Sequence, residues 1–166
     1  LAVLRPDLVR GLIIARPAWS TAPAPDNMRP NAEVGKLLGR LPREEALATF
    51  MESETARRLA VEAPDNLASL TGFFAREPLN TTGALLRAIA ADGPGVTEDQ
   101  LRSIQVPALV IGNQVDAVHP LALARKIAAL VPNATLAEIT PKAVDRARYV
   151  AEFQTAMDDF LKGFTT

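Results

Sequence analysis

Three short apolar runs, separated by segments of helical periodicity, constrain the fold of this chain more than any other feature. They span Val9 to Ala15, Ala108 to Ile111 and Thr135 to Ile139. The first is rich in β-branched residues and predicts a strand buried on both faces. Strands that alternate with helices favour parallel pairing through right-handed crossovers. The sequence therefore predicts an α/β fold with a small parallel sheet of three strands flanked by helices.

Capping residues and periodicity indicate the helices beside these strands. Thr97 and Gln100 form a capping box that begins a short helix before the second strand. A helix is predicted from Pro120 to Leu130, because proline is tolerated at a helix start. The segment from Asp145 to Phe164 carries aromatic and aliphatic side chains at helical spacing, which is typical of a helix packed on a core.

The chain changes character between the first and second strands. Residues 16–30 are rich in proline and alanine and predict a long irregular connection. Residues 31–95 contain several segments of helical periodicity, with no pattern typical of a strand. We therefore predict a core formed by residues 1–30 and 96–166, with a helical insertion at residues 31–95.

Composition excludes several classes of function. The formal net charge of −1 gives no electrostatic case for binding nucleic acid or an anionic membrane. With no cysteine and one histidine, the chain has no thiolate ligand or disulfide, and we expect no metal site. We expect no membrane span and no signal peptide, and therefore a cytoplasmic protein. The preference for alanine, and for arginine over lysine, suggests a bacterial gene.

Motifs for cofactors are also absent from the sequence. It has no phosphate loop and no dinucleotide fingerprint, so we expect no cofactor. Gly35 and Gly39 form a GxxxG pattern, but the surrounding helix is polar and the pattern carries little information.

The residues that could do chemistry follow the predicted strands. Ligands of open α/β sheets bind beyond the carboxyl ends of the strands, which points to the loops after each strand. Asp116 follows the second strand and could orient an imidazole, or simply bond to nearby backbone amides. His119 could act as a general base, or only close the turn before the next helix. No serine lies in the Gly-x-Ser-x-Gly turn of a nucleophile elbow.

The layout as a whole resembles the C-terminal portion of an α/β-hydrolase. VRGLIIARPAW resembles the sixth strand of that family and its following loop. IQVPALVIGNQVDAVHPLALARKIAALVPNATLAEI resembles the segment with the seventh strand, the acid, the next helix and the eighth strand. Residues 31–91 resemble the helical cap, and LAVLRPD resembles the end of the helix after the nucleophile. The resemblance covers essentially the whole chain and is most specific around PALVIGNQVDAVHP.

This resemblance implies a site that the chain contains only in part. Asp116 takes the position of the acid in a Ser–Asp–His triad, while the serine and both oxyanion-hole donors would precede Leu1. The loop that normally supplies the histidine reads TPKAVDRARYV and has none. Either His119 replaces it, or the protein is a divergent, non-catalytic relative. Arg16 and Trp19 would shape the substrate pocket, although Trp19 could instead pack only against the cap.

Two functions from different classes follow. In the first, the chain is a fragment of a hydrolase that acts on an ester or amide-type small molecule, and is inactive alone. In the second, it is a non-catalytic module that binds a small molecule or a protein through its helical cap. The unpaired edge of the first strand leads us to expect self-association or marginal stability in either case.

Overall fold

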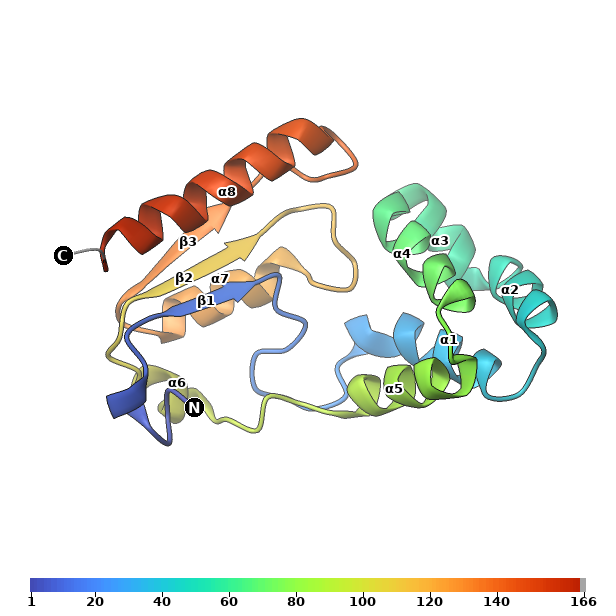
Figure 1. Cartoon of the computed structure of the whole chain (residues 1–166), viewed down its shortest axis with the longest axis horizontal. Helices are drawn as coiled ribbons and strands as arrows, with labels where there is room; N and C mark the ends of the chain where they lie inside the picture. The colour runs from blue at the N-terminus through green and yellow to red at the C-terminus, as the bar shows by residue number, and fades with distance from the viewer. Residues whose placement is uncertain (165–166) are drawn as a thin grey trace. The chain divides into compact units, whose positions relative to one another are not determined.

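The computed structural model describes residues 1–164, which form two compact units (Figure 1). The first unit contains residues 1–21, 94–115 and the described residues from 119 onward, and it holds the sheet. The second contains residues 22–93 and 116–118, and it is helical. None of the helices within residues 1–164 combines the length and apolar character needed to cross a membrane.

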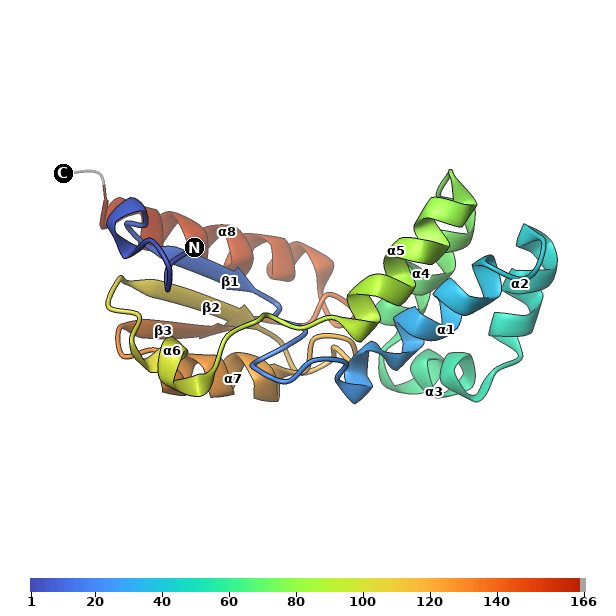
Figure 2. The ribbon, with the colours of Figure 1, turned by 90° about the horizontal axis from the view of Figure 1, so that it is seen from below.

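The first unit is built on a parallel sheet of three strands in the order β1-β2-β3, as predicted. The strands are β1 (Leu12–Ala15), β2 (Ala108–Gly112) and β3 (Ala134–Glu138). Leu109 of β2 lies between Ile13 and Thr135 in the register. Every residue of β2 is buried, because strands flank it on both sides and helices cover both faces (Figure 2).

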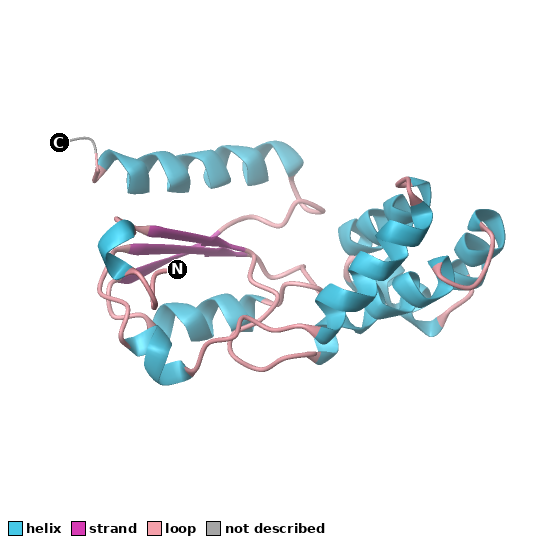
Figure 3. Cartoon of the chain, turned by 60° about the horizontal axis from the view of Figure 1, so that its bottom comes forward, coloured by secondary structure: helices cyan, strands magenta, loops and turns pink. Residues whose placement is uncertain are grey.

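The two faces of the sheet are covered by different helices (Figure 3). Helix α7 (Leu121–Leu130) packs on the face that carries Ala108 and Val110. Helix α8 (Arg146–Lys162) packs on the face that carries Leu109 and Ile111, through the half-buried side chains of Tyr149, Phe153, Ala156, Met157 and Phe160. Alternate residues of a strand point to opposite faces, so the residues of β2 that face α7 alternate with those that face α8.

The predicted burial of the first strand on both faces is wrong. Ile13 is 37% exposed and Ala15 is also exposed, whereas Leu12 and Ile14 are half-buried. The strand begins at Leu12, not Val9, and it lies at the edge of the sheet. The predicted helix end at LAVLRPD is also absent, since a turn and a short 3-10 helix, η1 (Pro6–Leu8), occupy this segment.

Helix ends in the first unit follow the local chemistry of the sequence. The predicted capping box is present: Thr97 Oγ1 accepts from the Gln100 amide, and Gln100 Oε1 accepts from the Thr97 amide. It begins α6 (Glu98–Arg102). Asp145 Oδ1 accepts from the Arg148 amide at 3.0 Å and begins α8. The carboxylate of Asp145, in the loop after β3, therefore has a structural role.

The second unit is a bundle of short helices around an apolar core of Phe50, Leu59, Leu70, Phe74 and Leu86. The rings of Phe50 and Phe74 lie 5.7 Å apart. Its elements are η2 (Asp26–Met28), α1 (Arg29–Leu38), α2 (Arg43–Met51), α3 (Glu54–Glu62), α4 (Pro64–Gly72), η3 (Phe73–Ala75) and α5 (Leu79–Ala91).

The two ends of the segment 22–93 lie beside each other. The Ala24 amide donates to the Asp92 carbonyl at 2.9 Å. A Cβ on Gly93 would lie 2.9 Å from Pro23 Cα, so only glycine permits this approach. The two ends of the segment are therefore fastened together.

Helices α1 and α5 approach closely through glycines. A Cβ on Gly35 would lie 2.8 Å from the Gly83 carbonyl oxygen and 2.9 Å from the Arg87 amide nitrogen. Arg87 Nη1 also donates to the Gly35 carbonyl at 2.6 Å. Gly35 therefore has a packing role that the GxxxG pattern did not lead us to expect.

Replacing Gly35 with alanine should destabilise the second unit by about 1–3 kcal/mol, because the new methyl group would overlap backbone atoms. Gly72→Ala is the matched control. Its Cβ would meet nothing within 4 Å and its backbone is helical, so a gain of about 0.4–1 kcal/mol is expected. Urea denaturation followed by circular dichroism measures both. Equal stabilities for the two variants would contradict the packing role.

Candidate functional site

The candidate site lies where the strands of the first unit end. Arg16 follows β1, Asn113 follows β2 and Thr140 comes shortly after β3. Parallel strands bring these loops to one edge of the sheet, where ligands of such folds bind. The residues after β2 divide between the two units: His119 belongs to the first, while residues 116–118 belong to the second.

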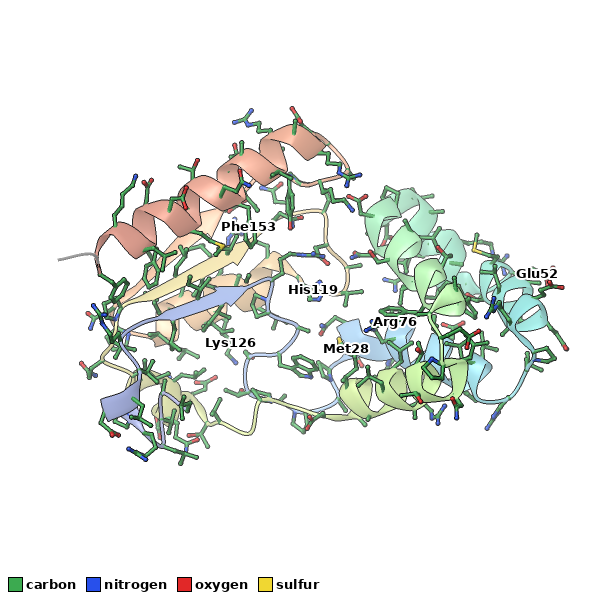
Figure 4. The ribbon with its side chains drawn as sticks, in the orientation of Figure 1. Met28, Glu52, Arg76, His119, Lys126 and Phe153 are labelled. Carbon is green, nitrogen blue, oxygen red and sulfur yellow. The ribbon has the colours of Figure 1, made fainter. Side chains whose placement is uncertain are left out.

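Arg16 and His119, which are far apart in the sequence, come together in the first unit. Arg16 Nη2 lies 3.2 Å from His119 Nδ1, and the contact is partly buried. The guanidinium can only donate, so His119 Nδ1 is the acceptor in this contact. His119 lies two residues before the first residue of α7 (Figure 4). Its Nδ1 thus faces a cation, whereas the Nδ1 of a triad histidine donates to a carboxylate.

The backbone of Arg16 has a left-handed conformation. Its φ is 50°, which is uncommon for a residue with a side chain. The Arg16 amide still donates to the Ile111 carbonyl at 2.8 Å, so the sheet fixes this residue at the last rung of β1. Strained backbone of this kind gathers at functional sites.

Trp19 follows in the same loop and is half-buried. Its indole Nε1 is buried and has no hydrogen-bond partner within residues 1–164. Leaving a buried donor unpaired costs about 1–3 kcal/mol. The indole N–H is therefore a donor that a bound molecule could satisfy.

Asp116 is held within the second unit by an asparagine from α4. Asn66 Nδ2 donates to Asp116 Oδ1 at 3.0 Å, and Asn66 Oδ1 accepts from the Ala117 amide at 2.6 Å. Asp116 is 6% exposed and Asn66 is 4% exposed. One buried amide thus fixes both the carboxylate and the backbone beside it, which gives Asp116 a defined orientation.

A second asparagine holds the next residue. Asn27 Nδ2, from η2, donates to the Val118 carbonyl at 2.7 Å. Sequence reasoning missed both asparagines. Asn66 stands in the first turn of a helix and Asn27 in a short 3-10 helix, positions where asparagine is ordinary, so no local signal marks them.

A polar hollow of about 490 Å³ in the second unit adjoins this segment. Ala117 lines it together with Asp26, Asn27, Arg29, Thr55 and Arg58, among others. Within residues 1–164, no three histidine, cysteine, aspartate or glutamate side chains are grouped so that they could hold a metal ion.

The loop after β3 is held by a carboxylate of α8. The Thr140 amide donates to Glu152 Oε2 at 2.6 Å, and Arg148 Nε donates to Oε1 at 2.7 Å. The Thr140 hydrogen bonds, together with Arg148, lower the pKa of Glu152 from 4.5 to about 2. Glu152 therefore anchors the loop after β3, which contains no histidine.

Asn66→Ala should lower the stability of the second unit by about 2–3 kcal/mol, because it removes the side-chain amide that bonds both to the buried carboxylate of Asp116 and to the Ala117 backbone. Asn80→Ala, at an exposed position of α5, should change stability by about 0.5 kcal/mol or less. Urea denaturation compares the variants, and hydrogen exchange reports the Ala117 amide directly. Unchanged protection of that amide in Asn66→Ala would contradict the assigned role.

Glu152 should contribute to acid unfolding. Its folded-state pKa is depressed, so its stabilisation is present above about pH 4.5 and is lost as the pH falls towards 2. Glu152→Gln should therefore lose less stability than the wild type between pH 5.5 and pH 3, as measured by urea midpoints. Glu44→Gln, at an exposed position, should keep the wild-type dependence. Identical pH profiles for all three proteins would refute this contribution.

Comparison with known proteins identifies the fold. No family model matches the chain, and no curated protein matches it significantly by sequence. Solved structures do match. An esterase from Thermogutta terrifontis is 18% identical with a TM-score of 0.63, and the match covers 99% of this chain and 60% of that one. The enol-lactonase from Burkholderia xenovorans is 22% identical with a TM-score of 0.59, over 98% of this chain and 60% of that one.

A third structure is described as an α/β hydrolase enzyme from a deep-sea metagenome library of the Medee basin. It is 15% identical with a TM-score of 0.60, and the match covers 99% of this chain and 59% of that one. The chain therefore has part of the α/β-hydrolase fold, and its order of elements corresponds to the C-terminal portion predicted from the sequence. It spans about 60% of the length of these structures.

Proposed function

We propose that this chain is the C-terminal part of a serine hydrolase that cleaves an ester or amide-type bond in a small molecule, with Asp116 as the acid that orients the catalytic base. The observation that carries the proposal is the setting of Asp116. It follows the central strand β2, it is 6% exposed, and Asn66 fixes its Oδ1. A buried, oriented carboxylate beyond a strand end is what a catalytic base requires of its partner.

The nucleophile of the proposed reaction is not among the serines of this chain. Ser53 Oγ caps α3 by accepting from the Ala56 amide. The hydroxyls of Ser69 and Ser103 donate to backbone carbonyls within their own helical turns, at 2.8 Å each. Ser20 lies in the loop after β1, away from any strand-to-helix turn. The serine and the oxyanion hole would come from a longer protein, so the chain alone would be inactive.

Arg16 and Trp19 would contact the substrate in this proposal. Both lie in the loop after β1, where Arg16 has its left-handed backbone and Trp19 has an unpaired indole N–H. His119 would serve as the base only if its Nδ1 donated to a carboxylate, because a triad histidine needs a proton on that nitrogen. The reaction requires no cofactor, since acyl transfer by a serine uses side chains and backbone amides alone.

A non-catalytic binding module is the second candidate, and two observations favour it. The loop after β3 has no histidine and is bound to Glu152. His119, the one histidine of the sequence, presents its Nδ1 to a cation. Such a module would hold a small molecule or a protein through the helical unit without cleaving it.

Labelling with a fluorophosphonate probe separates the two functions. The 166-residue chain should show no labelling and no esterase turnover. A longer product of the same gene should label at an upstream serine if the hydrolase proposal is right, and resist labelling if the binding module is right. Asp116→Asn in the longer product should slow labelling by about 100-fold or more, because the base loses its orientation. Turnover by the 166-residue chain that disappears in Asp116→Ala would overturn the proposal.

A further inference from the structure

The polar hollow of the second unit is built by three segments that are distant in the sequence. Asn27 and Pro30 come from the chain around the start of α1, Thr55 and Arg58 come from α3, and Ala117 comes from the segment after β2. All of the lining residues belong to the second unit, so the hollow does not involve the edge of β1. Its volume of about 490 Å³ is typical of a site for a small molecule.

Arg58 places a cation in the hollow with most of its hydrogen-bond donors unused. Its Nη1 lies 3.7 Å from Glu62 Oε2, which is an ion pair but is too long for a hydrogen bond. Its guanidinium has no other partner within residues 1–164. Arg29, which also lines the hollow, is paired with Asp26 at 2.8 Å. Arg58 is therefore the arginine of this hollow that is available to a bound carboxylate.

Glu54 places an anion in the same hollow. It lies four residues before Arg58 on α3, and residues at this spacing share one face of a helix. Among residues 1–164, Glu54 forms an ion pair neither with Arg58 nor with any other residue. The hollow thus presents one cation and one anion on the same face of a helix, and both are available to a ligand.

Two oxygen atoms near Glu54 favour a ligand that donates hydrogen bonds. Thr55 Oγ1 donates its own proton to Glu33 Oε2 at 2.5 Å, so the lone pairs of the hydroxyl remain to accept from a ligand. Asn31 follows Pro30 in α1 and is 7% exposed. Its Oδ1 is buried and has no hydrogen-bond partner within residues 1–164. An acceptor without a donor beside the hollow is a second indication that a donor binds here.

We propose that this hollow binds a small zwitterion, an α-amino acid, with its carboxylate on Arg58 and its ammonium on Glu54 and Thr55. A guanidinium binds a carboxylate through two parallel hydrogen bonds, while a carboxylate and a hydroxyl supply acceptors for an ammonium. An anion alone would also meet Glu54, and a cation alone would also meet Arg58, whereas a zwitterion complements both charges. The inference concerns the second unit and does not depend on the proposed cleavage reaction.

Titration of the 166-residue chain with L-alanine, followed by nuclear magnetic resonance, tests the binding directly. L-Alanine should shift the amide signals of Thr55 and Ala117 in a saturable manner at millimolar concentrations. Propionate lacks its ammonium and ethylammonium lacks its carboxylate. Each of these two probes should bind about tenfold more weakly than L-alanine, or weaker still, because it can use only one of the two charged side chains.

Two substitutions remove the charges of the site one at a time. Arg58→Gln and Glu54→Gln should each raise the dissociation constant for L-alanine by about tenfold or more. In Glu54→Gln, L-alanine should bind no more tightly than propionate, because the ammonium has lost its anion. Arg40→Gln is the matched control, at an exposed position just after α1 that does not line the hollow, and should leave the dissociation constant unchanged. Circular dichroism checks that each variant keeps its helices.

Several results would overturn the proposal. These are the absence of a saturable shift with L-alanine, equal affinities of the wild type for L-alanine and for either of the other two probes, and an effect of Arg40→Gln as large as that of Arg58→Gln. Shifts confined to residues outside the hollow would also overturn it. Fluorophosphonate labelling reports on the cleavage reaction and not on this hollow, so failure of one proposal can be told apart from failure of the other.

Discussion

The hydrogen-bonding demand of one buried strand organises the first unit. All five residues of β2 are buried, so its backbone groups must be satisfied by strands on both sides. β1 and β3 supply these partners in parallel, and α7 and α8 exclude water from the two faces. Gly112 ends the strand directly under α7, where a Cβ would lie 2.9 Å from Ala124 Cβ and from Leu121 Cδ1. At this close approach the chain leaves the sheet and enters the segment that carries Asp116 and His119.

The elements of the sheet could be predicted because their signals are local. Short apolar runs, the capping box at Thr97 and the proline before α7 each act within a few residues, and each marks an element of the structure, although the first strand begins at Leu12 and not at Val9. The burial of β1 could not be predicted in the same way. LIIA has the composition of an interior strand, but exposure depends on whether another strand lies beside it, and no local pattern encodes this. The contact of Gly35 with Gly83 could not be predicted for a similar reason, because it joins two helices that are distant in the sequence.

The candidate site also has a part that the sequence could predict and a part that it could not. Asp116, His119, Arg16 and Trp19 could be selected because they follow strands, and ligands bind where strands end. Their partners could not be selected. The Arg16–His119 contact and the Asn66 clamp on Asp116 join positions that only the folded chain brings together. The orientation of the imidazole, which bears directly on its chemistry, is a property of the tertiary structure.

The fastening of the helical segment at its two ends has an evolutionary consequence. Ala24 is bonded to Asp92, and Gly93 lies against Pro23, so residues 22–93 form a loop whose ends are already closed. A segment joined in this way can be lengthened, shortened or exchanged without changing the span that the flanking chain must bridge. Within it, Asn66 bonds to Asp116 and Asn27 bonds to the Val118 carbonyl, so any replacement would have to supply these two contacts. The helical segment could thus change in length and sequence during evolution while the strands kept their pairing register.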